Sequence, residues 1–183
     1  SENTMASHIQ VHGNGQQEKR VREEPAEATS GRNETKIQII MATIRETLKQ
    51  LAADTLPDYT YLFEDWDTAD TKLEKLNYPA IVCIIPASGT TEIRNGRVYD
   101  TVNVALAYLD TVPRGAEGDE NGECIDRMKV AGARMIRAIN QSHQFEPLEG
   151  QQYYETIIER LSTIVSGVMY SLQLTQSIGG CEV

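Results

Sequence analysis

An Asn-Gly pair at Asn95 and Gly96 separates two β-prone stretches, and this pair constrains the fold more than any other feature of the chain. Both residues tolerate a positive φ, which a two-residue type I′ turn requires, so the pair predicts a tight β-hairpin. The arm after the turn runs from Arg97 to Asp110 and is polar near the turn and apolar farther along. Because a strand rises about 3.3 Å per residue, this arm is expected to project beyond a small domain.

Two longer stretches have the periodicity of amphipathic helices. The first is expected to start at Thr35 as N-cap and to end before Leu56-Pro57, because the residue before a proline avoids the α region. The second covers residues 124–139 and includes Gly132 on its apolar face. A glycine inside a helix costs up to about 1 kcal/mol relative to alanine, so this helix is expected to lie close against a sheet.

The other elements are shorter. Residues 59–65 and the apolar run 78–86 are predicted to be strands, the second of them buried on both faces, and residues 153–177 one or two more strands. A short helix over 68–77, capped by Thr68, is expected between the first two strands. This order predicts an α+β fold, with a mostly antiparallel sheet, a long projecting β-hairpin and two main helices packed on one face.

The apolar residues are unevenly distributed, and this suggests the domain boundaries. Residues 1–35 contain too few large apolar side chains to offset their ordering entropy, so they are expected to form a disordered or extended N-terminal arm. Residues 36–178 are predicted to form a single domain, and residues 179–183 a short C-terminal tail.

The formal net charge of −10 argues against general nucleic-acid binding, since neutralising phosphates needs an excess of Lys and Arg. It argues equally against binding to an anionic membrane, and no apolar run reaches the roughly 20 residues of a membrane span. The three cysteines lack the close spacing of a disulfide framework, which is typical of a reducing compartment.

No combination of residues forms a convincing catalytic or metal site. The stretch from Glu117 matches the start of a calcium loop, but Met128 stands where the bidentate acid is required. The acids around Trp66 are expected to cap the short helix, and Cys83 lies in an apolar strand that should keep its thiol inert. We therefore expect no catalytic residue, no cofactor and no bound metal.

Two charged surfaces are not explained by the expected fold. The first is the hairpin tip, where an inter-subunit or tube contact is predicted for Glu92, Arg94, Asn95, Gly96, Arg97 and Asp100. The second is the glycine-rich loop 110–123, with an acidic contact or lumen-facing surface predicted for Glu117, Asp119, Glu120 and Glu123. Opposite charges at two ends of one small domain suit head-to-side contacts in a ring.

The order of elements resembles the tail terminator, or tail-completion, proteins of long-tailed bacteriophages and prophages. The resemblance covers roughly residues 36–176. It lies in an opening amphipathic helix, the apolar strand "YPAIVCIIP", the long strand "RVYDTVNVALAYLD", a second helix and the closing "STIVSGVMYSLQLTQ".

The resemblance implies a non-enzymatic structural protein of the virion tail or neck, assembled in the cytoplasm of the bacterial host. Such subunits form a ring, commonly a hexamer, that caps the tail tube, ends its growth and provides the surface where the head docks. The implied partners are further copies of the chain, the tail tube protein and head–tail connector proteins, while DNA passes without specific binding. The alternatives are another connector or neck component, a small ligand-binding or regulatory α+β domain that dimerises through its sheet edge, and an enzyme.

Overall fold

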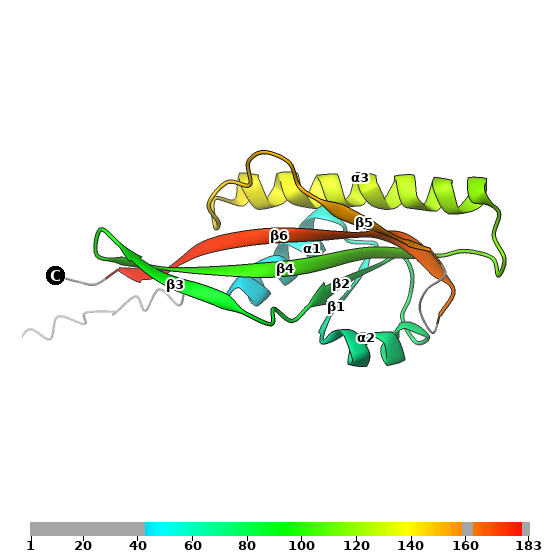
Figure 1. Ribbon diagram of the computed structural model, residues 1–183, viewed down its shortest axis with the longest axis horizontal. Helices are drawn as coiled ribbons and strands as arrows, with labels where there is room; N and C mark the ends of the chain where they lie inside the picture. The colour runs from blue at the N-terminus through cyan, green and yellow to red at the C-terminus, as the bar shows by residue number, and fades with distance from the viewer. Residues whose placement is uncertain (1–42, 159–162, 181–183) are drawn as a thin grey trace, which may run out of the picture. The chain divides into compact units, whose positions relative to one another are not determined.

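The computed structural model describes residues 43–158 and 163–180 of the chain (Figure 1). The helices are α1 (Ile44–Thr55), α2 (Trp66–Leu73) and α3 (Gly118–Ser142). The strands are β1 (Thr60–Glu64), β2 (Ala80–Ile84), β3 (Gly89–Arg94), β4 (Arg97–Thr111), β5 (Tyr154–Ile158) and β6 (Val165–Gly180). The N-terminal arm predicted for residues 1–35 lies outside the described residues.

The strands form a six-stranded sheet in the order β1-β2-β4-β6-β5, with β3 paired to β4. Only β1 and β2 are parallel, and every other pair is antiparallel. β6 follows β4 along its whole length, so β2 and β3 share the other edge of β4. The predicted α+β fold with a mostly antiparallel sheet is confirmed.

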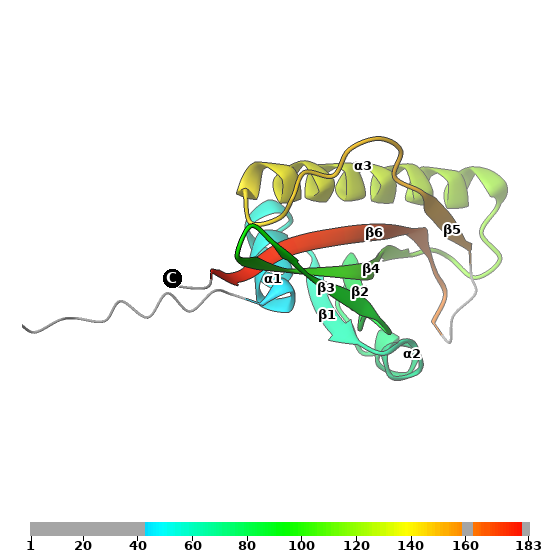
Figure 2. The same ribbon diagram turned by 60° about the vertical axis from the view of Figure 1, so that its left-hand side comes forward.

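α1 and α3 cover one face of the sheet, as expected for the two main helices (Figure 2). The core between them includes Leu48 of α1, Met135 of α3, and Leu106 and Tyr108 of β4, all of them buried. The much shorter α2 packs on the opposite face, where Leu73 joins a second cluster of buried residues from β2, β4 and β6. Buried side chains on both faces explain the continuous apolar run of β2.

Three predicted helix starts are wrong. α1 begins at Ile44, and its N-cap is Thr43 rather than Thr35, which lies outside the described residues; Thr43 and Glu46 form a capping box. α2 is capped by Asp65 instead of Thr68, because Asp65 Oδ1 accepts the backbone N–H of Thr68 at 2.9 Å; this confirms that an acid beside Trp66 caps the helix. In each case a side-chain oxygen at the true cap satisfies a free N–H of the first turn.

The third wrong start concerns α3, which begins at Gly118 inside the stretch predicted as a loop. The backbone N–H of Glu117, the N-cap residue, donates to Glu120 Oε2 at 2.9 Å. Acidic side chains also favour the positive end of the helix macrodipole. Acids of the stretch predicted as a loop therefore stabilise the start of the longest helix in the described part of the chain.

The hairpin arm is confirmed, but it is not a free two-stranded projection. β6 pairs with β4 from Thr111 opposite Val165 to Arg97 opposite Gly180, so a third strand lies along the arm up to its tip (Figure 1). β6 thus continues into Gly179 and Gly180, which were predicted to belong to the tail. The arm is a narrow three-stranded extension of the main sheet.

Candidate functional site

The turn at the tip of the arm has the backbone that the Asn-Gly pair requires. Asn95 and Gly96 both have positive φ, 52° and 73°, and Arg94 is paired with Arg97 across the turn. Such a turn matches the right-handed twist of the two strands that it joins. The tip is therefore a regular structure that presents its side chains in defined directions.

Arg94 is held by contacts within its own chain. Its guanidinium lies 3.2 Å from Glu92 and 2.9 Å from Glu146, and its Cζ lies 4.1 Å from the centre of the Tyr99 ring. Glu146 belongs to the connection after α3, and its backbone N–H donates to the Thr175 carbonyl of β6 at 2.8 Å. Arg94 consequently ties the hairpin tip to this connection.

The other predicted tip residues occupy different surroundings. Glu92, Asn95, Gly96 and Arg97 are exposed at the end of the arm. Asp100 is half-buried and lines a groove beneath the arm instead of facing outward. The structure thus brings five of the six predicted residues together at the tip and places the sixth, Asp100, in the groove.

The sequence reasoning missed an apolar component of the tip. Ile93 is 71% exposed on β3, and Ile178 is 49% exposed on β6. Ile93 pairs with Val98, so strand alternation puts both on the face that carries Asp100 and Val102. The exposure of Ile93 could have been inferred from its position in a short strand beside the turn. Such a strand lies at a sheet edge, where few neighbouring side chains can cover an isoleucine.

The groove lies between α1 and the root of the arm and has a volume of about 230 Å³. Its wall is mostly apolar and includes Leu48 of α1, Phe63 of β1 and Val102 of β4, with Asp100 at its margin. Pockets for small-molecule ligands are typically about 300–1,000 Å³, so this groove is nearer the size of one large side chain.

The four predicted acidic residues lie at the start of α3, at the opposite end of β4 from the tip (Figure 1). All four side chains are exposed, namely those of Glu117, Asp119, Glu120 and Glu123. The strand between the two surfaces has 15 residues, which corresponds to roughly 45–50 Å. Two charged surfaces are therefore separated by the length of β4.

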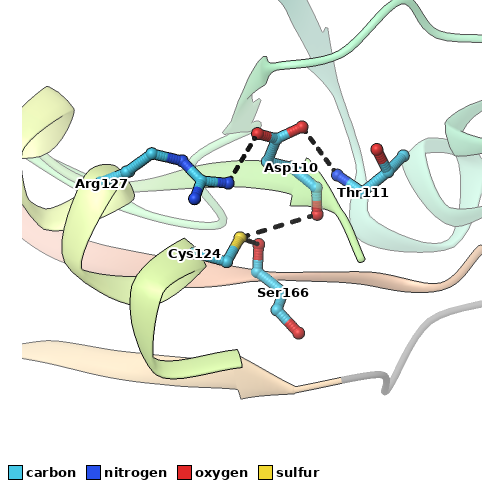
Figure 3. Close-up of polar contacts among 5 residues, drawn as sticks. All are labelled: Asp110, Thr111, Cys124, Arg127 and Ser166. Carbon is cyan, nitrogen blue, oxygen red and sulfur yellow. Dashed lines mark hydrogen bonds and ion pairs between the residues drawn. The ribbon is translucent and has the colours of Figure 1, made fainter. Parts of the chain in front are cut away.

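A polar cluster fastens the start of α3 to the sheet (Figure 3). Arg127 Nη2 lies 3.2 Å from Asp110 Oδ2, and the Thr111 backbone N–H donates to Asp110 Oδ1 at 2.8 Å. The buried Cys124 thiol donates to the Ser166 carbonyl at 3.3 Å. These contacts join the end of β4 and the beginning of β6 to one turn of α3, which is a structural role.

The two described cysteines lie in surroundings that suppress the thiolate. Burial raises the pKa of the Cys83 thiol to about 11, and burial together with the nearby Asp110 raises that of Cys124. Both are free thiols, and both are protonated near neutral pH. The thiolate is the nucleophile and the metal ligand, so these sites do not favour thiol chemistry.

Two of the acids around Trp66, Glu64 and Asp65, are engaged in local structure. The backbone hydrogen bond from Thr68 lowers the pKa of Asp65, and Glu64 forms an ion pair with Lys72. Trp66 itself is 36% exposed at the first position of α2. Within residues 43–158 and 163–180, no group of three or more His, Cys, Asp or Glu side chains is arranged to hold a metal ion.

Comparison with protein-family models and with curated protein sequences finds no match to this chain. None of the helices in the described part of the chain is long and apolar enough to cross a membrane. The arm tip and the acidic start of α3 are the two exposed charged surfaces at the ends of β4.

Proposed function

We propose that this protein is a non-enzymatic structural subunit of a phage or prophage tail. It forms a ring, hexameric in the resemblance described above, that caps the tail tube, ends its growth and provides the surface where the head docks. Its partners are further copies of itself, the tail tube protein and head–tail connector proteins, and DNA passes through the ring without specific binding.

One observation carries the proposal: an exposed arginine and a group of exposed acids lie at opposite ends of β4. Arg97 is at the arm tip, whereas Glu117, Asp119, Glu120 and Glu123 surround the start of α3. A contact between the tip of one subunit and the α3 start of the next is heterologous, and a heterologous contact closes into a ring when the rotation between subunits divides a full turn. It also offsets part of the repulsion that a net charge of −10 imposes on each pair of subunits.

The composition of the arm agrees with this use. Behind the charged tip the arm carries the uncharged Thr101 and Thr175, whose half-buried hydroxyl groups lie 2.8 Å apart across β4 and β6. Arg94 is already paired within the chain, so Arg97 is the cation at the tip better suited to an inter-subunit contact. The ring contact is accordingly assigned to Arg97, with Glu92 and Asn95 beside it.

The test uses the full chain mixed with the tail tube protein of the same phage or prophage. Electron microscopy is expected to show rings at the ends of tubes, and the wild-type chain should halt tube polymerisation. Arg97→Glu should abolish both effects, whereas Arg137→Glu, at an exposed position on the side of α3, should preserve them.

A charge exchange makes the test specific. If Arg97 meets the acidic start of α3, then Asp119→Arg with Glu123→Arg should restore capping in the Arg97→Glu chain. Normal capping by Arg97→Glu alone would contradict the assigned contact. Tubes that grow unchecked in the presence of the wild-type chain would contradict the proposed function as a whole.

A further inference from the structure

The outer edge of β3 is an exposed backbone edge of the arm. All residues of β3 from Gly89 to Ile93 are exposed, and β3 pairs only with β4 in the described structure. An edge strand of this kind presents free N–H and C=O groups that can pair with another strand. The strand carries few charges and one large exposed apolar side chain, that of Ile93.

We infer that β3 pairs with β3 of a second copy, antiparallel and about a twofold axis through Ile93. In this register Ile93 lies opposite Ile93 of the other copy. Glu92 of each copy lies opposite Arg94 of the other copy. The inference does not rest on the proposed function.

The direction of the backbone groups permits this register. Arg94 and Arg97 flank the two-residue turn, and this closing pair directs its N–H and C=O groups toward each other. The backbone N–H and C=O groups of successive residues point alternately to the two edges of a strand. The N–H and C=O groups of Ile93 therefore point to the open edge of β3. Two copies can then exchange both hydrogen bonds of an Ile93–Ile93 pair.

The side chains select this register over its neighbours. Pairing about Ile93 puts the two isoleucines side by side on one face, and each is 71% exposed in the single chain. On the other face each Glu92 meets the Arg94 of the partner copy while keeping its own Arg94 within 3.2 Å. A register centred on Glu92 would instead place two carboxylates directly opposite each other, which is destabilising.

The pairing belongs to the free protein rather than to the ring. A ring that meets the tube on one side and the head on the other is polar, whereas a twofold contact joins two subunits related by a half-turn. The paired form covers the β3 edge next to Arg97 and so competes with the ring contact proposed above. It also protects an edge that would otherwise favour aggregation.

Cross-linking tests the register directly. In a chain with Cys181→Ser, Ile93→Cys should form a disulfide-linked dimer on mild oxidation, because directly opposite Cα atoms lie about 5.5 Å apart. Thr91→Cys is the matched control, since in this register the two copies of residue 91 are roughly 13 Å apart along the strands. Cross-linking of Thr91→Cys without Ile93→Cys would overturn the inference.

Sedimentation velocity of the full chain over a range of concentrations tests the pairing itself, without tube protein. The wild-type chain should dimerise reversibly, and Ile93→Lys should weaken the dimer at least tenfold. Val130→Lys, at a 62% exposed residue of α3, should leave it unchanged. Glu92→Arg and Arg94→Glu should each weaken it, and the double exchange should recover most of the loss.

A wild-type chain that stays monomeric up to its solubility limit would overturn the pairing, as would a dimer unaffected by Ile93→Lys. Either result leaves the capping experiment untouched, because that experiment reports on Arg97 and the tube protein. Conversely, a wild-type chain that forms the β3 dimer but does not cap tubes would contradict the proposed function and leave the β3 pairing intact.

Discussion

A methyl group placed on Gly132 of α3 would lie 2.3 Å from Cε2 of Tyr170 on β6. The helix thus lies so close to the sheet that the aromatic ring occupies the space of the missing side chain. This confirms the expectation that a glycine within the helix marks a close approach to the sheet.

Gly132→Ala should therefore destabilise the fold despite the higher helix propensity of alanine. Overpacking of a core costs about 1–3 kcal/mol, which exceeds the propensity gain of up to about 1 kcal/mol. The measurement is the free energy of unfolding in denaturant. Gly122→Ala is the matched control, since nothing lies within 4 Å of a Cβ at that position in the same helix. The control should be neutral or stabilising, and equal effects at the two positions would contradict the packing argument.

Ser166→Ala should reduce stability by about 1–3 kcal/mol, because it removes the donor to a buried amide oxygen. Ser166 Oγ donates to Asn121 Oδ1 at 2.6 Å, and Asn121 Nδ2 donates to the Ala116 carbonyl at 3.0 Å. A double-mutant cycle with Asn121→Ala measures the coupling between the two side chains. Additive losses, with no coupling, would show that the hydrogen bond contributes nothing.

Stability should fall above pH 9 in a manner that depends on Cys83. The pKa of its thiol is about 11 in the folded chain against a usual 9.0, so between these values the unfolded chain has lost a proton that the folded chain retains. The free energy of unfolding then decreases with rising pH by up to about 1.4 kcal/mol per unit. This contribution is fully present below pH 9 and lost as the pH rises through about 11.

The check is the slope of unfolding free energy against pH for wild type and Cys83→Ala. Burial is the largest cause of the raised pKa of the buried Tyr61 and Tyr108, and it acts in both chains; their smaller interaction with Cys83 is lost in the variant together with the thiol. The variant should be less stable at neutral pH because of its cavity, but its slope should be shallower. Parallel curves would contradict the assignment to Cys83.

Arg94→Ala should loosen the hairpin tip with little effect on global stability. The Arg94–Glu146 pair is partly exposed, with 40% and 45% of the two side chains accessible, and such pairs contribute about 1 kcal/mol or less. Hydrogen exchange should accelerate in β3 and around Glu146. Arg97→Ala is the control and should leave exchange in the connection after α3 unchanged.

The sequence by itself determined the features that depend on neighbouring residues. The turn at Asn95-Gly96, the apolar face of α3 around Gly132 and the buried run of β2 all follow from local conformational preference or from periodicity. The first residue of each helix was harder to predict from the sequence, because several Thr and Asp residues near each start can serve as caps. The choice among them depends on which backbone N–H groups the folded chain leaves free.

Only the tertiary structure decided how the arm is built and which tip residues are available. β6 follows β4 to the tip, Arg94 contacts Glu146, and Asp100 turns into a groove against α1. Each of these contacts joins residues more than 50 positions apart, and local patterns do not specify which distant partner a strand or a charge will meet. The exposure of Ile93 follows from the same cause, since it depends on which strands cover the edge of β3.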